Sequence, residues 1–249
     1  MINGKRILVV VTARKGSKGI AGKNYKELLG KPLFMWSVLA SLNSKYVDHT
    51  VVSSNCEEVE KITQEYICKT MFSPLFAHNK IPFFIQRPDE ISGDTSKNEE
   101  ALIHVLENVE ENYDVIINLQ PTSPIRSSEL LDKCIEEYYN GDYDSLLTAI
   151  KITPFIWQKI NGKWKYTVDK NDCCNRKMRQ EFNQEEFVWH DCGSVFITDV
   201  KVMLETGCRI GKKLCVFPVE GMNSLQIDEE FDFELIEKMA EAKGLRSLV

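Results

Sequence analysis

Short apolar runs alternate with amphipathic stretches along most of the chain, a pattern typical of repeated strand–helix units. The apolar runs predict strands at residues 5–12, 49–53, 81–85, 114–119, 144–150, 193–198 and 213–218. The amphipathic stretches predict helices at residues 32–43, 55–68, 96–111, 127–139 and 228–243. This order predicts an α/β fold with a mostly parallel central sheet.

Two helix starts carry further local signals. Pro32 suits the first turn of its helix, and Asn55 with Glu58 three residues later resembles a capping box. Residues 68–82 look like an irregular insertion between a helix and a strand. We expect this insertion to fold onto its own domain, with a contact to another chain as the alternative.

The alternation breaks after Thr153. Residues 157–168 alternate around Asn161-Gly162, which is a strong hairpin signal, and residues 169–186 are polar and irregular. We therefore expect a single domain over residues 1–249, in which residues 153–190 form an excursion that covers the active site or pairs with a second subunit.

Composition excludes several classes of protein. The chain has 249 residues, 43% hydrophobic and 27% charged, with a net charge of −6 and no basic stripe, so we expect no nucleic-acid partner. No apolar run approaches the roughly 18 residues of a membrane span, and we expect a cytoplasmic protein with no membrane partner. The eight cysteines form no CxxC pair and the four histidines no metal spacing, which argues against a zinc site.

The strongest chemical signal is the loop after the first strand, residues 13–24, ARKGSKGIAGKN. Its glycines allow backbone N–H groups to approach an anion closely, and its four cations can neutralise a polyphosphate. The loop matches neither the Walker A nor the GxGxxG pattern. The alternative from composition alone is a flexible basic loop without a specific ligand.

Together with Gly30-Lys31-Pro32, this loop resembles the signature of the acylneuraminate (CMP-sialic acid / nonulosonic acid) cytidylyltransferase family. Further segments resemble that family in the same order along residues 5–235: VVSSN at 51–55, RPDEISGDT at 87–95, NLQPTSPIR at 118–126, RQE at 179–181, HDCGSVF at 190–196 and LQIDEEFDF at 225–233. The resemblance implies a Rossmann-like nucleotide-diphospho-sugar transferase fold.

The resemblance also implies roles for individual residues. The expected nucleotide contacts are Ala13, Arg14, Gly16, Ser17, Lys23, Asn24, Arg87, Ser96, Asn98 and Gln120. The expected contacts to the sugar substrate are Gln120, Thr122, Ser123, Lys151 and Arg179. Arg179 is the candidate for the substrate carboxylate, and a solvated surface arginine is the alternative. Arg14, Lys18 and Lys23 would neutralise the leaving pyrophosphate.

The metal motif departs from the family. Relatives carry two aspartates that hold Mg²⁺, whereas this chain has Gln226 in place of the first and keeps Asp228. Because glutamine is a neutral ligand, we expect Asp228 to bind Mg²⁺ with weaker affinity than a pair of carboxylates would. For Asp232, helix capping is as good an interpretation as chemistry.

The implied activity is transfer of CMP from CTP to the anomeric hydroxyl of a sialic-acid-like nonulosonic acid, with release of pyrophosphate. The expected partners are CTP, a nine-carbon sugar acid and, through the aromatic residues of the excursion, a second copy in a homodimer. Burial of those aromatics within one chain is the alternative. Two other functions stay open: a CMP-Kdo-type or other sugar nucleotidyltransferase, and a non-catalytic nucleotide-binding homologue, which Gln226 favours.

Overall fold

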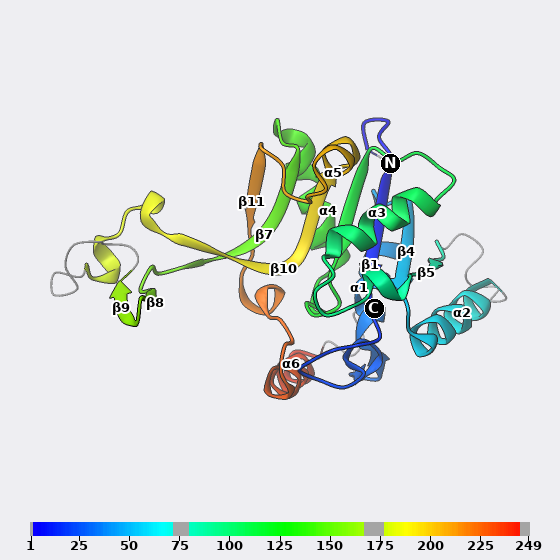
Figure 1. Cartoon of the computed structure of the whole chain (residues 1–249), viewed down its shortest axis with the longest axis horizontal. Helices are drawn as coiled ribbons and strands as arrows, with labels where there is room; N and C mark the ends of the chain where they lie inside the picture. Colours follow the sequence, from blue (N-terminus) through cyan, green and yellow to red (C-terminus); the bar gives the residue numbers. More distant parts are fainter. Residues whose placement is uncertain (1, 72–79, 167–176, 245–249) are drawn as a thin grey trace.

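A seven-stranded sheet runs through the body of the protein in the computed structural model, which describes residues 2–71, 80–166 and 177–244 (Figure 1). Its strand order is β11-β7-β10-β6-β1-β4-β5. All neighbours are parallel except β10, which is antiparallel to both β6 and β7. The strands are β1 (Ile7–Thr12), β4 (His49–Ser54), β5 (Phe83–Gln86), β6 (Val115–Leu119), β7 (Ser145–Ile152), β10 (Val188–Asp199) and β11 (Leu214–Pro218). The predicted mostly parallel sheet is confirmed.

Helices cover both faces of this sheet because β1 is apolar on both sides. Ile7, Val9 and Val11 pack in one core with α1 (Leu33–Leu42), α2 (Glu57–Met71) and α4 (Ser128–Asn140). Leu8 and Val10 pack in a second core with α3 (Asn98–Asn108) and α5 (Val200–Thr206). Such a strand, buried on both faces, is typical of parallel α/β sheets.

A third core joins the C-terminal helix α6 (Glu230–Ala242) to the chain that follows β1. Between them lies a small hairpin of β2 (Glu27–Leu28) and β3 (Lys31–Pro32). The buried residues of this core are Ile20, Leu28, Leu33, Trp36, Ile227, Phe233 and Ile236. The loop after β1 is therefore anchored by residues more than 200 positions away in sequence.

The predicted hairpin forms an arm that projects from the body (Figure 1). Strands β8 (Trp157–Ile160) and β9 (Lys163–Tyr166) pair around Asn161 and Gly162, both with positive φ (51° and 79°), as a two-residue hairpin turn requires. Extended chain at the end of β7 and the start of β10 connects the arm to the sheet.

Several predicted boundaries are wrong at the ends of elements. Pro32 lies just before α1, because it pairs with Glu27 in β3. The side chain of Asn55 does not cap α2: its Oδ1 accepts from the backbone N–H of Lys15, and its Nδ2 donates to Asp89. Residues 68–71, predicted to be irregular, belong to α2, while residues 72–79 of the insertion lie outside the described residues. The helix predicted at 96–111 covers only Asn98–Asn108.

Strand β10 is longer than the predicted 193–198, and its residues 188–190, assigned to the excursion, pair with β7. Its first residues are exposed, so no buried face marks them as a strand in the sequence. Helix α5 was not predicted. Among the described residues, no helix combines the length and the apolar character needed to cross a bilayer.

A buried carboxylate fixes the connection between α1 and β4. Asp132 on α4 is 5% exposed and accepts hydrogen bonds from Ser44 Oγ (2.6 Å) and from the backbone N–H of Lys45 (3.1 Å). Replacing it with alanine would leave both donors without this acceptor.

We predict that Asp132→Ala lowers the free energy of unfolding by about 2 to 3 kcal/mol, measured by urea denaturation, because buried hydrogen bonds to a charged group are lost. The matched control is Asp142→Ala, since Asp142 is 90% exposed and its ion pair with Lys213 lies at the surface. Equal effects of the two substitutions would contradict this account.

Candidate active site

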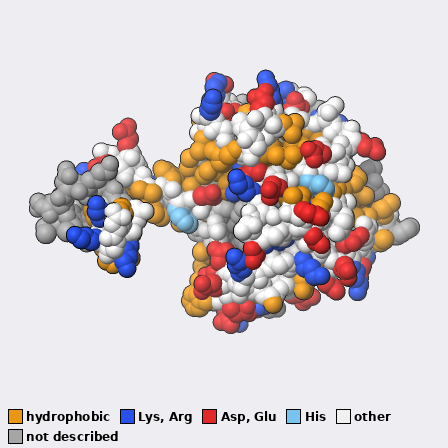
Figure 2. All heavy atoms as spheres, viewed as in Figure 1, with side chains coloured by type: hydrophobic (Ala, Val, Ile, Leu, Met, Phe, Trp, Pro, Cys, Tyr) orange, Lys and Arg blue, Asp and Glu red, His pale blue; other side chains and the backbone are white. Residues whose placement is uncertain are grey.

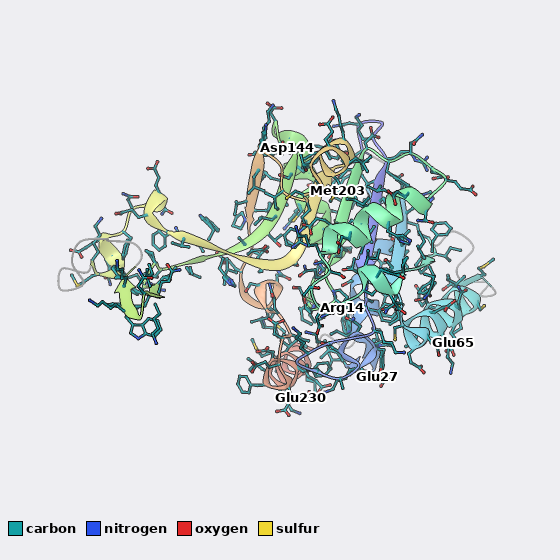
Figure 3. All side chains as sticks on the ribbon, viewed as in Figure 1. Arg14, Glu27, Glu65, Asp144, Met203 and Glu230 are labelled. Atoms are coloured by element: carbon teal, nitrogen blue, oxygen red, sulfur yellow. The ribbon has the colours of Figure 1, made fainter. Side chains whose placement is uncertain are left out.

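The polar pocket of the protein lies beyond the carboxyl ends of β1 and β6, where open α/β sheets bind ligands. It has a volume of about 270 Å³ and is lined by Thr12, Arg14, Gly16, Ser17, Lys23, Asn24, Arg87, Asn98, Gln120, Pro121, Thr122, Gln226 and Asp228. Figure 3 shows Arg14 at this end of the sheet, above Glu230 of α6. The lining thus combines three cationic side chains, one carboxylate and several amides.

The loop after β1 is packed directly against the backbone of Asp228. A Cβ atom at Gly19 would lie only 2.0 Å from the carbonyl oxygen of Asp228, so no side chain fits there. Lys23 Nζ donates to the carbonyl oxygen of Ile227 (2.9 Å) and lies 3.8 Å from Asp228 Oδ1. Burial lowers the pKa of Lys23, while the nearby Asp228 opposes this shift. The loop therefore brings one half-buried cation next to the candidate metal ligand.

Asp232 has a structural role. Its Oδ2 accepts from the backbone N–H groups of Asp228 and Glu229, both at 2.9 Å, and these bonds lower the pKa of Asp232. The backbone N–H of Ile227 donates to the carbonyl oxygen of Thr122 (2.8 Å). Residues 226–228 are thereby fixed to the exit of β6 on one side and to α6 on the other.

Arg14 and Lys18, the two cations on the outer side of the loop, both contact the carboxylate of Asp94. Arg14 Nη1 lies 2.8 Å from Asp94 Oδ1, and Lys18 Nζ lies 3.6 Å from Asp94 Oδ2. The hydrogen bond from Arg14 lowers the pKa of Asp94. Asn24 Nδ2 donates to the carbonyl oxygen of Arg14 (2.8 Å) and holds the loop backbone at the pocket.

Arg87 is a buried cation with unused donors. It is 4% exposed, and its Nε and Nη2 are buried and have no hydrogen-bond partner among the described residues. Burial, and then the charge of Arg14, lower the pKa of Arg87 to about 10. An unsatisfied buried guanidinium is costly, and its position in the pocket lining is explained by a ligand that supplies acceptors.

A bulge in β10 shapes the other wall of the pocket. Its register with β7 shifts between Asp191 and Phe196, and Gly193 in the bulge has φ = 62°. A Cβ atom at Gly193 would lie 2.6 Å from Gln120 Oε1 and 2.9 Å from Gln226 Nε2. The two glutamine amides thus converge on Gly193, whose positive φ favours glycine.

Arg126 supports this side of the pocket through buried hydrogen bonds. It is buried and donates to the carbonyl oxygen of Gln120 (2.9 Å), to Ser37 Oγ (2.9 Å) and to Ser194 Oγ (3.3 Å). Burial lowers the pKa of Arg126 to about 9. The side chain therefore fixes the exit of β6 to α1 and β10, a role that the sequence did not predict.

The pocket brings most of the predicted nucleotide residues together. Six of the predicted site residues do not line it: Ala13, Lys18, Ser96, Ser123, Lys151 and Arg179. Ala13 is fully buried, and Ser123, 2% exposed, donates to the carbonyl oxygen of Cys192 (3.0 Å) in the bulge. Ser96 Oγ accepts from the N–H of Gly93. In this geometry Ala13, Ser96 and Ser123 support the pocket without lining it.

Lys151 and Arg179 lie toward the arm. Lys151 Nζ is hydrogen-bonded to Gln184 and lies 3.9 Å from the ring centre of Phe187, and Arg179 Nε donates to Thr153 Oγ1 (2.8 Å). Lys151 also lines a second hollow of about 380 Å³ at the same edge of the sheet, with Ile150, Trp189, Pro218, Val219, Glu220, Gly221 and Ser224.

Thr12 and Pro121 line the first pocket and were not predicted to lie in the site. Small residues at the end of a strand carry no distinctive signal in the sequence.

Comparison with known proteins finds similarity to cytidylyltransferases. Residues 8–80 match a family model described as cytidylyltransferase. The chain is 25% identical to post-translational flagellin modification protein B of Campylobacter coli, with 97% of each chain covered. It is 26% identical to CMP-N,N'-diacetyllegionaminic acid synthase of Legionella pneumophila, covering 95% of this chain and 97% of that one.

It is also 25% identical to the N-acylneuraminate cytidylyltransferase of Escherichia coli O18:K1:H7 over 98% of this chain, but spans only about half of that longer protein, 54%.

Solved structures confirm the fold. The 4-diphosphocytidyl-2C-methyl-D-erythritol synthase of Anaerococcus prevotii has a TM-score of 0.67 at 13% identity, covering 96% of this chain and 100% of that one. A CMP:2-keto-3-deoxy-manno-octonic acid synthetase complexed with CTP has a TM-score of 0.65 at 13% identity, covering 96% and 99%. The chain is thus similar to cytidylyltransferases over residues 8–80 and resembles the acylneuraminate and legionaminic acid enzymes along nearly its whole length.

Proposed function

We propose that the chain transfers CMP from CTP to the anomeric hydroxyl of a sialic-acid-like nine-carbon sugar acid and releases pyrophosphate. The anomeric oxygen forms a bond to the α-phosphorus, the bond from that phosphorus to the oxygen bridging to the β-phosphate breaks, and the hydroxyl proton passes to a phosphate oxygen or to water. The observation that carries the proposal is the single pocket in which the loop cations, the unsatisfied Arg87, Gln120 and Asp228 meet. Relatives named as enzymes of CMP-legionaminic and acylneuraminate synthesis support it.

Arg87 supports cytosine as the base. Cytosine presents two neighbouring acceptors, O2 and N3, to a pair of donors, whereas uracil carries a donor at N3. A guanidinium has donors and no acceptor, so it matches the cytosine edge and leaves the uracil N3–H without a partner. Arg87 would therefore select CTP over UTP as well as bind it.

The loop supports binding of the triphosphate. Lys23 reaches the pocket from the half-buried position beside Asp228, and Arg14 enters from the outer side. Lys18 lies just outside the lining, with a side chain that is 76% exposed, so it can move toward the terminal phosphate. Transfer of a nucleotidyl group depends mainly on positioning and on neutralisation of charge, which these cations would supply to the leaving pyrophosphate.

The residues present fit a Mg²⁺ ion that arrives with the nucleotide. Among the described residues there is no cluster of three or more candidate metal ligands. Asp228 is nevertheless well exposed toward the pocket, and Mg²⁺ is commonly held by one carboxylate plus substrate phosphates and waters. When bound, the ion would neutralise charge on the reacting phosphate. With the neutral Gln226 beside it, Asp228 would bind the ion weakly in the absence of CTP.

The acceptor sugar would lie between the two hollows at the sheet edge. Gln120 and Thr122 line the nucleotide pocket on the side of the β10 bulge, and Lys151 with Trp189 lines the second hollow beyond it. A cation at that position suits the carboxylate of a sugar acid. Arg179 is exposed on the arm, and we propose that it reaches a carboxylate bound in the pocket of a second copy.

We propose that the protein is a cytoplasmic homodimer formed through the arm. Trp157 and Trp164 are 44% and 67% exposed, and the ring of Trp157 lies 5.4 Å from that of the buried Tyr166. Figure 2 shows hydrophobic and basic side chains on the arm, separated from the body by a narrow neck. Exposed aromatics at the end of a projecting element are typical of an interface core.

We expect pyrophosphate release from CTP and Mg²⁺ with one member of a panel of nonulosonic acids, and none from ATP, GTP or UTP. Asp228→Asn should lower the rate at least about 100-fold, because the proposed metal ligand is lost, whereas the exposed Asp142→Asn serves as the matched control. Release with Kdo alone would reject the sugar class. No release with any sugar, despite CTP binding, would favour the non-catalytic homologue and point to Gln226.

We expect the purified protein to have about twice the chain mass of 28.6 kDa by light scattering after gel filtration. The double variant Trp157→Ser/Trp164→Ser should have the mass of one chain, because the exposed aromatic surface of the arm is lost. Phe231→Ser on α6 removes an equally exposed aromatic (69%) away from the arm and should leave the mass unchanged. A double variant that keeps the mass of the wild type would overturn the assignment of the arm.

A further inference from the structure

Arg14 and Lys18, the two cations on the outer side of the loop, have an anionic partner within the chain. Asp94 contacts Arg14 through one carboxylate oxygen (2.8 Å) and Lys18 through the other (3.6 Å). Both cations are the ones proposed to meet the triphosphate. The carboxylate therefore lies where it competes with phosphate oxygens for the same donors.

We infer that Asp94 is the internal counterion of the nucleotide loop, holding Arg14 and Lys18 in position while the pocket is empty and yielding them to the triphosphate. Asp94 acts through these two side chains and is thus a positioning residue. The inference rests on the proposed function, because it requires a nucleotide triphosphate as the ligand of the loop.

In the described part of the chain, the side chain of Asp94 makes no hydrogen bond within its own segment. It lies between the short helix at Asp89–Ile91 and α3. The start of α3 is satisfied by Glu100, whose carboxylate accepts from the N–H of Lys97 (2.8 Å), and not by Asp94. The turn itself is closed by Ser96 Oγ, which accepts from the N–H of Gly93 (3.0 Å). The carboxylate of Asp94 is left to the loop cations.

The neighbouring Asp89 provides a contrast. It lies five positions earlier in the same segment and accepts from Asn55 Nδ2 (2.8 Å), a neutral donor. Removing the charge of Asp89 changes the net charge by the same amount without freeing Arg14 or Lys18. If Asp94 competes with the triphosphate for Arg14 and Lys18, Asp94→Asn and Asp89→Asn should change CTP affinity differently. If only the net charge matters, the two substitutions should change it equally.

The effect on nucleotide binding has a definite sign. A triphosphate that enters the pocket must break two ion pairs and then lies near a like charge. Both the broken ion pairs and the repulsion by Asp94 disfavour triphosphate binding. Removing the charge of Asp94 should therefore favour it. Asp94 and Lys18 are largely exposed, with side chains 48% and 76% accessible, so the effect is moderate and screened by salt.

We would measure the affinity of CTP by isothermal titration calorimetry at low salt in EDTA, and KM and kcat with Mg²⁺, for the wild type and three variants. Asp94→Asn should bind CTP about 5-fold more tightly, as expected for the loss of a partly exposed ion pair. Its KM should fall by a similar factor without a rise in kcat. Asp94→Glu, which keeps the charge, and Asp89→Asn should bind CTP like the wild type. The gain should disappear in 0.5 M NaCl.

Unchanged or weaker CTP binding by Asp94→Asn would overturn the inference, and so would an equal gain in Asp89→Asn. If the wild type binds CTP and makes the CMP-sugar but Asp94→Asn gains nothing, only the counterion role fails. If the wild type neither binds CTP nor releases pyrophosphate from CTP with Mg²⁺ and any of the sugar acids, the proposed function fails with it.

Discussion

Repulsion among the cations at the carboxyl end of β1 is the constraint on which the rest of the site depends. Arg14, Lys18, Lys23 and Arg87 converge there in a protein whose net charge is −6. Asp94 balances Arg14 and Lys18, and Asp228 balances Lys23, while two buried donors of Arg87 have no partner in the described part of the chain. The charge of these cations is thus only partly compensated by the described residues, and the proposed triphosphate would complete the balance.

Packing contacts from distant parts of the chain hold these cations in place. The third core ties the loop to α6, and the contact of Gly19 with the backbone of Asp228 leaves no space for a side chain. On the opposite wall, Arg126 and Ser123 hold the exit of β6 and the β10 bulge, which brings Gly193 against Gln120 and Gln226. Loop, bulge and C-terminal segment come from distant parts of the chain, so the pocket exists only in the folded protein.

Local patterns were sufficient to predict the sheet, the arm hairpin and the cationic loop, because apolar periodicity, the Asn161-Gly162 turn and glycine spacing act over a few residues. What they missed depends on distant contacts. Asn55 looked like a helix cap, yet its amide bonds to Lys15 and Asp89. Ser123 looked like a substrate contact, yet it is buried against Cys192. No local pattern singled out Asp94, because its partner Arg14 lies 80 residues earlier in the sequence.

Arg87 offers the most direct test of the pocket as a CTP site, because a ligand with acceptors would satisfy its buried donors, which have no partner in the described residues. The measurement is the affinity of CTP and of UTP, by calorimetry, for the wild type and Arg87→Met, together with the thermal midpoint of unfolding. We expect the wild type to prefer CTP over UTP. Arg87→Met should lose this preference and bind CTP at least about 10-fold more weakly. Its thermal midpoint should be equal or higher, because a costly buried cation has been removed. Wild-type CTP affinity in Arg87→Met, or a large loss of its stability, would contradict the account.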